Sequence, residues 1–374
     1  MRILQINETS ALGGGADQHF HDLCSLLTKE GQQVQTFCPG DITLQTGRDV
    51  ISRPLEEVLR EFRPDIVHVH GLRQKHLWLL EFLGEGLPLV QTWHDHAGFC
   101  LNQSLYNAKG YCERCRGGHS FQAGLQGCVN VPLSIATWWR RQVLGQDPYR
   151  RVQRIIVPSF YLRDKALEWG VRQKIQPIYN FTRHPVQTAL PEREQGTIVF
   201  SGRLSALKGV RVLLEAINFM DCRLIILGDG ELREEVAQAV AASKPGKILW
   251  PGFCTGEEYW EQLGKASVLV LPSLCPETFG LSICDAFSLG IPAVGTDLGG
   301  ARELIGPGGE RGLLVPPGDA AALRQALVTM LTQKRETTRA QGEAGRCFVE
   351  ENLGWDRYYP ALMECYREAV DERD

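Results

Sequence analysis

Short apolar runs of strand length alternate with longer amphipathic stretches along the whole chain. This alternation predicts β-α units, because a parallel strand needs a crossover connection, usually a helix, before the next strand. We expect a helix at residues 16–29 and strands in two series. The first series is expected at residues 2–6, 33–38, 66–70, 87–92 and 154–158. The second is expected at residues 198–201, 222–227, 248–251, 268–272 and 293–296.

The length of 374 residues suits two domains of this kind. Residues 182–195 are rich in proline, threonine and charge, and we interpret them as the interdomain linker. The expected domains are an N-terminal domain at 1–185, with a cysteine-containing insert at about 97–130, and a C-terminal domain at 186–354. The amphipathic stretch at 355–374 follows another helix and no strand comes after it. We expect it to be a C-terminal helix that crosses back to the N-terminal domain.

The overall composition favours small-molecule chemistry in a cytoplasmic protein. The net charge is only −4, so the whole molecule has no electrostatic basis for binding nucleic acid. No apolar run approaches the roughly 18 residues of a membrane span. The N-terminal apolar run is too short, and too polar afterwards, for a signal peptide. In a reducing cytoplasm the 12 cysteines should be buried thiols or metal ligands, not disulfides.

A glycine-rich turn, Gly13-Gly14-Gly15, follows the first expected strand and precedes a helix. Such a turn lets the backbone of Gly14 and Gly15 approach a bound group closely, although a tight structural turn uses glycine equally well. A Rossmann dehydrogenase would need G-x-G-x-x-G and an acidic residue at the end of the second strand. The chain has neither; the second strand ends at Phe37-Cys38-Pro39.

Two basic residues, Arg203 and Lys208, lie in the loop Gly202-Arg-Leu-Ser-Ala-Leu-Lys-Gly209 between a strand and a helix. Ligands of open α/β sheets bind at this edge, and two cations there could neutralise a diphosphate. The alternative for either residue alone is an exposed basic loop.

A second loop of the C-terminal half, Pro272–Asp285, also joins a strand to a helix. Backbone amides at Gly280 and Leu281 would face an anion at the start of that helix. The carboxylates of Glu277 and Asp285 could accept hydrogen bonds from the transferred sugar and from a ribose, respectively. Asp285 could equally be a charge that favours the helix dipole.

These loops and several shorter turns resemble the retaining glycosyltransferases of family 4, which have the GT-B fold. The family's pattern matches Gly202-Arg203 with Lys208-Gly209, Pro276-Glu277-Thr278-Phe279-Gly280 and three glycine-containing turns. Those turns are Gly228-Asp229-Gly230, Pro251-Gly252-Phe253 and Asp297-Leu298-Gly299-Gly300. Asp285 stands where the family has glutamate, one methylene longer.

The resemblance implies two Rossmann-like domains that face an interdomain cleft, with the donor held mainly by the second. It implies a UDP-, GDP- or ADP-sugar donor, an acceptor hydroxyl of unknown origin and no cofactor for catalysis. The absence of Asp-x-Asp from the sequence agrees with metal-independent chemistry. Catalytic roles are implied for His94, Arg203, Lys208 and Glu277. Donor contacts are implied at Gly14, Gly15, Gly202, Gly228, Asp229, Phe253, Thr278, Phe279, Gly280, Leu281 and Asp285.

His94 is assigned from the strand-end stretch Gln91-Thr92-Trp93-His94, which resembles the Thr-x-His of the family. It could hydrogen-bond the donor sugar or stabilise charge at the anomeric carbon. His68 and His70 alternate on an expected strand. For His68 we favour a buried histidine whose hydrogen bonds are satisfied.

Four cysteines, Cys100, Cys112, Cys115 and Cys128, fall in the glycine-rich insert. Four thiolates could form a structural zinc site, although a second C-x-x-C pair is missing. Buried thiols and an iron–sulfur cluster are the alternatives.

The basic and aromatic stretch Trp138-Trp139-Arg140-Arg141 follows that insert, and Tyr149-Arg150-Arg151 comes shortly after. These residues could rest on anionic lipid at the inner face of a membrane, as would suit a lipid-linked acceptor. An ordinary solvated helix face is the other interpretation.

The sequence therefore predicts a retaining glycosyltransferase of glycan, glycolipid or small-molecule glycoside synthesis. Two alternatives use the same cleft. A nucleotide-sugar epimerase or hydrolase would release nucleotide without an acceptor. A non-catalytic sugar-nucleotide-binding protein would be signalled by loss of the diphosphate-binding cations, and both cations are present.

Overall fold

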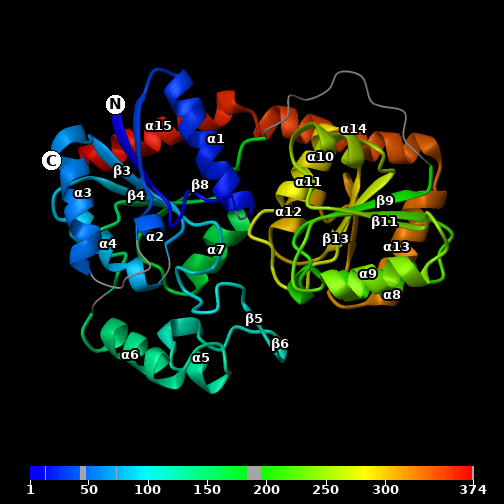
Figure 1. Ribbon diagram of the computed structural model, residues 1–374, viewed down its shortest axis with the longest axis horizontal. Coiled ribbons are helices and arrows are strands. Elements are labelled where there is room, and N and C mark those ends of the chain that lie inside the picture. Colours follow the sequence, from blue (N-terminus) through cyan, green and yellow to red (C-terminus); the bar gives the residue numbers. More distant parts are fainter. Residues whose placement is uncertain (13, 43–47, 73, 146, 183–194, 373–374) are drawn as a thin grey trace. The chain divides into compact units, whose positions relative to one another are not determined.

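A computed structural model describes residues 1–12, 14–42, 48–72, 74–145, 147–182 and 195–372. Nearly all of the expected linker at 182–195 lies outside these residues. The chain forms two compact units, each built on its own sheet (Figure 1). Unit 1 comprises Met1–Gln103, Glu113–Asn180 and Tyr358–Asp374, and unit 2 comprises Ser104–Cys112 and Phe181–Arg357.

The sheet of unit 1 has six parallel strands in the order β2-β1-β3-β4-β7-β8. Its central strands β3, β4 and β7 consist mainly of apolar or β-branched residues and are buried on both faces, as parallel strands covered by helices require. The strands are β1 (Arg2–Ile6), β2 (Gln33–Phe37), β3 (Ile66–Val69), β4 (Leu89–Thr92), β7 (Arg154–Val157) and β8 (Lys174–Pro177).

Helices cover both faces of this sheet. Helices α1 (Gly15–Lys29) and α15 (Trp355–Asp371) lie on one face. The opposite face carries α3 (Arg48–Phe62), α4 (Trp78–Gly84) and α7 (Phe160–Glu168). The remaining short helices of the main body are α2 (Pro39–Ile42) and the 3₁₀ helix η1 (Gln74–His76). The chain passes from unit 2 to unit 1 within α15, so the C-terminal residues complete the fold of the N-terminal sheet.

The cysteine-containing insert forms a small helical layer. It contains the 3₁₀ helix η2 (Arg116–Gly118), α5 (Gln122–Leu125) and α6 (Val131–Gln142), which begins at an Asn130 cap. Just before it, β5 (Tyr106–Asn107) and β6 (Gly110–Tyr111) pair as a short antiparallel hairpin that is counted with unit 2. In the described part of the chain no helix is long and apolar enough to cross a bilayer.

Unit 2 has a second six-stranded parallel sheet, in the order β11-β10-β9-β12-β13-β14. This is the strand order of a dinucleotide-binding Rossmann sheet. The strands are β9 (Thr197–Ser201), β10 (Arg223–Leu227), β11 (Ile248–Gly252), β12 (Val268–Leu271), β13 (Ala293–Thr296) and β14 (Gly312–Val315). Their buried side chains, such as Phe200, Ile226 and Val270, form one core with helix residues including Leu213 and Leu327.

Seven helices cover the second sheet. One face carries α8 (Val210–Ile217), α9 (Arg233–Ala242) and α13 (Ala320–Thr332). The other carries α10 (Gly256–Gly264), α11 (Leu281–Ser288), α12 (Gly300–Ile305) and α14 (Arg335–Asn352). A 3₁₀ turn, η3 (Ala206–Lys208), precedes α8.

The strands expected from the sequence are confirmed to within two residues at their ends. Besides the short strands of the β5–β6 hairpin, two strands of the main sheets were missed. The edge strand β8 has the mixed sequence Lys-Ile-Gln-Pro, which carries little apolar signal, and β14 is only four residues long. In unit 2 the strand order reverses between β9 and β12, and in unit 1 between β1 and β3. Ligands of open α/β sheets bind at the carboxyl ends of such strands.

Candidate functional site

Arg203 and Lys208 lie in the loop that leaves β9, at the reversal point of the second sheet. Gly209 ends this loop with φ +71°, and a Cβ there would lie 1.9 Å from the carbonyl oxygen of Pro272, just past β12. Glycine therefore permits the loop after β9 to touch the end of β12. This contact brings Lys208 next to the loop that carries Glu277.

Lys208 and Glu277 form an ion pair between these two loops. The Lys208 ammonium donates to both carboxylate oxygens of Glu277, at 2.7 and 2.9 Å, and the Ser273 hydroxyl donates to the same carboxylate. Burial by itself lowers the pKa of Lys208, but attraction by Glu277 outweighs it, so the net pKa is raised. The side chain of Lys208 is 29% exposed and that of Glu277 12%, so the pair is largely withdrawn from water. Lys208 therefore stays charged at neutral pH.

The backbone of Glu277 is fixed by the loop after β13. Its carbonyl oxygen accepts a 2.6 Å hydrogen bond from the Gly300 amide. Gly299 has φ +68°, and a Cβ there would lie 2.4 Å from the same carbonyl oxygen. Three loops, after β9, β12 and β13, therefore meet around Glu277 through close contacts that glycine allows.

Helix α11 begins beside this carboxylate. Gly280 precedes its first residue, Leu281, in the left-handed conformation with φ +118°. The first amides of α11, at Leu281 and Ser282, lie at the positive end of the helix dipole. Thr278 is half-buried, whereas the Phe279 side chain is only 3% exposed and belongs to the core. A donor contact at Phe279 would therefore be made by its backbone.

Arg203 is exposed, and its guanidinium makes no hydrogen bond or ion pair with another described residue. Its charge is close enough to oppose the protonation of Lys208. The neighbouring turn is tight, since a Cβ on Gly228 would lie 2.0 Å from the Gly202 carbonyl oxygen. This close approach places Gly202 and Gly228 at the ends of β9 and β10.

Asp229 and Phe253 follow the neighbouring strands β10 and β11. The first is held by local contacts, whereas the second is exposed. The Asp229 carboxylate turns back to accept from the Gly230 amide at 2.8 Å and lies 3.6 Å from Arg233. Phe253 is 68% exposed after β11, where an aromatic ring could stack on a base.

Asp285 is buried, at 4% exposure, in the second turn of α11. The Tyr259 hydroxyl donates to its carboxylate at 2.9 Å and accepts from the Ser201 hydroxyl at 3.2 Å. Sequence reasoning missed Tyr259 and Ser273. Ser273 could have been suspected from its place at the end of β12, but nothing local marked Tyr259.

His94 of unit 1 belongs to a buried group of histidines that the sequence did not reveal. Its Nε2 lies 3.1 Å from Nδ1 of His70, and the two rings stack with centroids 5.4 Å apart. His19 packs edge-on against His94 at 5.4 Å and hydrogen-bonds Tyr358 of α15 at 3.2 Å. His68 is fully buried, with its ring nitrogens 2.7 Å from Tyr366 and Thr92.

The rings of His68, His70 and His94 are neutral at neutral pH, because burial lowers the pKa of each. Burial lowers the pKa of His94 to about 4, against the opposing charge of Asp17. Burial also lowers the pKa of His68 to about 3, and the charge of His94 adds to this effect. A neutral imidazole can donate one hydrogen bond and accept another, so His94 can serve either role but does not act as a cation.

The glycine turn of unit 1 ends at the start of α1. Gly14 caps this helix and Gly15 is its first residue, while Gly13 lies outside the described residues. Asn7, at the end of β1, donates to Asp17 of the first turn at 3.1 Å. Gly14 and Gly15 are both exposed, so their amides are accessible at the reversal point of the first sheet.

The four insert cysteines were expected to hold zinc. Cys100 is buried, and Cys112, Cys115 and Cys128 are half-buried. Among the described residues no three or more His, Cys, Asp or Glu side chains are arranged to hold a metal ion. Cys112 is counted with unit 2 and the other three with unit 1. A structural zinc therefore stays a prediction of the sequence alone.

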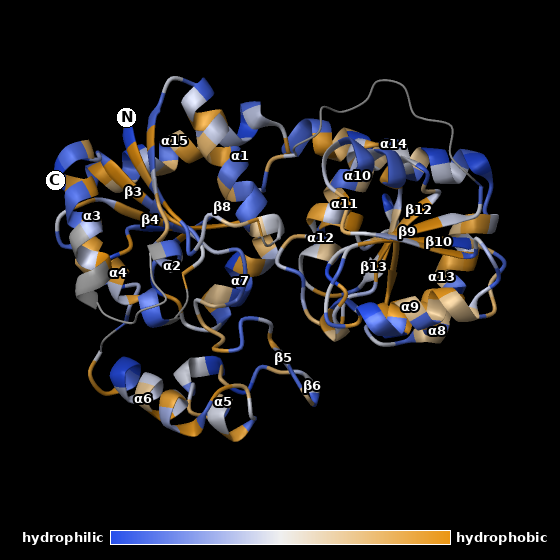
Figure 2. Cartoon of the chain, viewed as in Figure 1, coloured by the Kyte–Doolittle hydropathy of each residue, from blue (hydrophilic) through white to orange (hydrophobic). Residues whose placement is uncertain are grey.

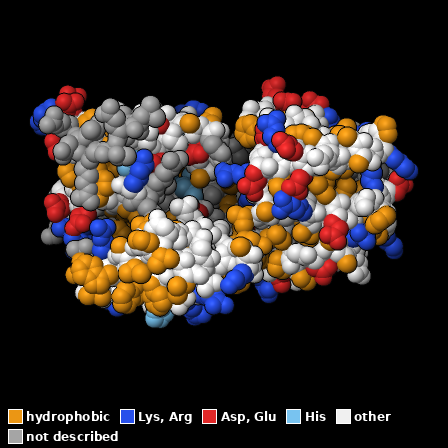
Figure 3. Space-filling model, turned by 60° about the horizontal axis from the view of Figure 1, so that its bottom comes forward, with side chains coloured by type: hydrophobic (Ala, Val, Ile, Leu, Met, Phe, Trp, Pro, Cys, Tyr) orange, Lys and Arg blue, Asp and Glu red, His pale blue; other side chains and the backbone are white. Residues whose placement is uncertain are grey.

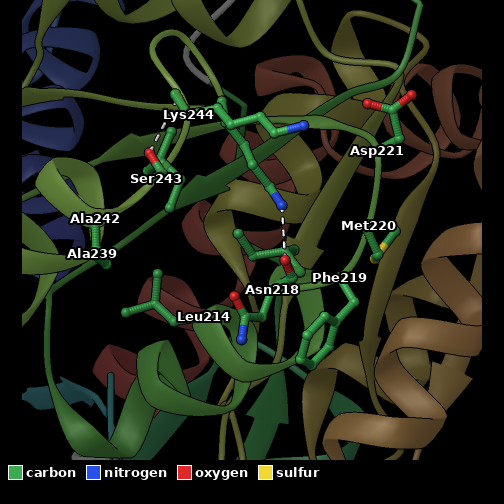
Figure 4. A pocket seen from close by; sticks show the side chains of 12 residues that line it. Leu214, Asn218, Phe219, Met220, Asp221, Ala239, Ala242, Ser243 and Lys244 are labelled. Carbon is green, nitrogen blue, oxygen red and sulfur yellow. Dashed lines mark hydrogen bonds between the residues drawn. The ribbon is translucent and has the colours of Figure 1, made fainter.

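A hollow of about 600 Å³ in unit 2 lies elsewhere (Figure 4). It is lined by the ends of α8 and α9 and by residues just before β10 and β11, including Phe219, Met220 and Ser243. This is the amino edge of the sheet, opposite the carboxyl ends where Lys208 and Glu277 lie. Its lining contains none of the expected site residues, so we do not assign it to catalysis.

Comparison with known proteins identifies the family of this chain. A family model described as Glycosyltransferase Family 4 matches residues 46–183, and one described as Glycosyl transferases group 1 matches residues 195–333. A phosphatidyl-myo-inositol mannosyltransferase of Mycobacterium leprae is 26% identical, over 94% of this chain and 92% of its own. A D-inositol 3-phosphate glycosyltransferase of Pseudarthrobacter chlorophenolicus is 29% identical, over 96% and 91%.

Solved structures show the same fold. A sucrose-phosphate synthase of Thermosynechococcus elongatus superimposes with a TM-score of 0.76 at 19% identity, covering 99% of both chains. Anabaena HepE in complex with UDP gives 0.70 at 16% identity, covering 98% of this chain and 99% of its own. The two Rossmann-like sheets define the GT-B fold. Within that class, the chain belongs to glycosyltransferase family 4.

Proposed function

We propose that this enzyme is a retaining glycosyltransferase that moves a sugar from a nucleoside diphosphate sugar to a hydroxyl of a glycan, a glycolipid or a small glycoside. The observation that carries the donor half of the proposal is the Lys208–Glu277 pair at the reversal point of the second sheet. It sets a fixed cation and a fixed carboxylate side by side. The Lys208 ammonium can bind a diphosphate, and the Glu277 carboxylate can accept hydrogen bonds from sugar hydroxyls.

In this mechanism unit 2 binds the donor. Arg203, Lys208 and the first amides of α11 stabilise the negative charge that develops on the departing diphosphate. Glu277, held by Lys208 and Ser273, accepts hydrogen bonds from the sugar that is transferred. Phe253 and Asp285 are assigned to the nucleoside.

Retention follows from attack on the same face that the diphosphate leaves. The bond from the anomeric carbon to the phosphate oxygen breaks as the bond to the acceptor oxygen forms. The departing phosphate oxygen takes the proton of the acceptor hydroxyl, so a separate protein base is not needed. His94, neutral and half-buried in unit 1, is assigned to a hydroxyl of the donor sugar.

The relatives support the choice of substrates. Two of them are named for transfer to inositol-containing acceptors, and Anabaena HepE was solved with UDP. We therefore propose a UDP-, GDP- or ADP-sugar as donor and a polyol or lipid-linked hydroxyl as acceptor. A lipid-linked acceptor would place the enzyme at the cytoplasmic face of a membrane.

A panel of UDP-, GDP- and ADP-sugars should identify the donor, with nucleotide release measured with and without inositol, inositol phosphate and phosphatidylinositol. We expect release that depends on an acceptor, and a product whose anomeric configuration by NMR equals that of the donor. Equal release without acceptor would indicate an epimerase or hydrolase. Binding of a nucleotide sugar without any turnover would indicate a non-catalytic protein.

A further inference from the structure

The outer face of α6 is apolar where a surface helix is normally polar. Seven of the fifteen large apolar side chains that the described residues expose lie between residues 125 and 144. Four of them, Val131, Ile135, Trp139 and Val143, follow one another at intervals of four residues. Residues four apart lie on one face of a helix, so these side chains form a single stripe. Their exposures are 44, 50, 48 and 56%.

The inner face of α6 is the more polar one. Ser134 is fully buried, and its hydroxyl donates to the Val131 carbonyl oxygen at 2.8 Å. Gly124 of α5 packs there, since a Cβ on it would lie 2.3 Å from the Ser134 hydroxyl oxygen. Ser134 and Gly124 thus meet on the inner side of α6, where Trp138 also packs edge-on against Phe121, while the four stripe residues face outward. Figure 2 colours much of the α5 and α6 ribbon as hydrophobic, and Figure 3 shows apolar side chains gathered on the surface of this part of the molecule.

The charge carried by this segment of the sequence has one sign. From Arg114 to Gln146 the sequence contains four arginines and neither aspartate nor glutamate, in a chain whose net charge is −4. Arg114 and Arg140 are exposed, and neither guanidinium makes an ion pair with a described residue. An apolar stripe flanked by unpaired arginines complements a bilayer surface that offers acyl chains and anionic headgroups.

We propose that α6 is a docking surface for an anionic lipid bilayer, with Ile135 and Trp139 inserted at the headgroup boundary and Arg114 and Arg140 against the headgroups. This proposal rests on the proposed function in one respect only: docking at the bilayer would give the enzyme access to a lipid-linked acceptor. Its physical basis is the stripe and the charge alone.

The test is co-sedimentation of the full chain with vesicles of phosphatidylglycerol and phosphatidylcholine in equal amounts, against vesicles of phosphatidylcholine alone. The protein should bind the anionic vesicles, and added salt should weaken binding because headgroup attraction is screened. Ile135→Ser combined with Trp139→Ser should lower the affinity by about tenfold or more. Arg114→Gln and Arg140→Gln should each lower it about fivefold.

The matched control is Phe219→Ser, which removes an aromatic side chain that is 84% exposed in unit 2. It should leave vesicle binding unchanged. Equal binding by wild type and the Ile135/Trp139 variant would overturn the proposal. So would a wild type that self-associates through the stripe without vesicles, because the stripe would then be an interface between copies. The α6 substitutions should leave nucleotide release with a water-soluble acceptor unchanged. Failure of the docking proposal can therefore be told apart from failure of the proposed transferase function.

A different observation concerns Gln5 of β1, whose two amide atoms join the histidine group to α15. Its Oε1 lies 2.9 Å from Nε2 of His70, and its Nε2 donates to the Tyr366 hydroxyl at 3.1 Å. An amide oxygen only accepts, so His70 must carry its proton on Nε2. The Nδ1 of His70 is then an acceptor, so the Nε2–H of His94 donates a hydrogen bond to it.

The hydrogen bonds on the other side of Gln5, through Tyr366 to His68, have fixed directions as well. The Tyr366 hydroxyl accepts from Gln5 and therefore donates to Nδ1 of His68, whose Nε2 donates to Thr92. Rotating the Gln5 amide by half a turn would reverse every one of these bonds. The geometry points to Gln5 as a positioning residue that sets the tautomer of His94, with hydrogen on Nε2 and a lone pair on Nδ1.

Nitrogen-15 spectra of histidine-labelled protein test this assignment, because they distinguish protonated from unprotonated ring nitrogens. Wild type should show His94 protonated at Nε2, and Gln5→Leu should convert His94 to a mixture of tautomers. His76, which pairs with Glu8 outside this group, should keep its spectrum and report an intact fold. A wild-type His94 protonated at Nδ1, or a tautomer unchanged in a folded Gln5→Leu variant, would overturn the assignment.

Discussion

Lys208→Met should lower kcat/KM for sugar transfer by about 100-fold or more while the fold is kept. The substitution removes a cation from the place where charge develops on the departing diphosphate, and losing one such fixed donor typically costs about 10²–10³ in rate. It also removes two of the hydrogen bonds to Glu277. Initial rates with the preferred donor measure the effect, and thermal unfolding shows whether the fold is intact.

Lys265→Met is the matched control, because Lys265 has a similar exposure of 31% and pairs with Glu261 in the same unit. It should transfer sugar at the wild-type rate. Arg203→Ala is a second variant whose fold should be undisturbed, since the guanidinium makes no contact that folding requires among the described residues. Wild-type turnover in both Lys208→Met and Arg203→Ala would contradict the assignment of the diphosphate site.

Glu277→Gln should reduce turnover by about 100-fold, whereas Asp285→Asn should raise the donor KM by about tenfold or less. The reason lies in the contacts of the two carboxylates. Glu277→Gln keeps the shape of the side chain but leaves the largely buried Lys208 without its counter-charge, and it brings a donor where the sugar needs an acceptor. Asp285→Asn retains an amide oxygen that can still accept from the Tyr259 hydroxyl.

Steady-state kinetics of the two variants with the same donor compare kcat with KM. The double variant Lys208→Met with Glu277→Gln should lose little more than either single one, because the two residues act as a pair. Equal effects of Glu277→Gln and Asp285→Asn on kcat would contradict separate roles. A tyrosine control, Tyr259→Phe, should reproduce the modest effect of Asp285→Asn and leave kcat nearly unchanged.

The sequence by itself determined the fold class, the strand series and the family. Parallel strands buried on both faces consist mainly of apolar residues, as in the Val-Leu-Val-Leu of β12, so period and length suffice to find them. The sequence also identified the glycines that shape the site loops. At Gly209 and Gly299 only glycine tolerates the positive φ and the close approach, so the residue type itself carries the information.

Only the tertiary structure decided what each site side chain contacts. The pairing of Lys208 with Glu277 joins residues 69 apart, and that of Asp285 with Tyr259 joins residues 26 apart. From the sequence, Asp285 looks like a shortened glutamate whose length could be restored. Its burial beside Tyr259 now predicts that Asp285→Glu would overpack the site. Hydrogen bonds between distant segments produce no periodic pattern in the sequence. The connection of His94 through His70 and Gln5 to the C-terminal helix therefore exists only once the chain has folded.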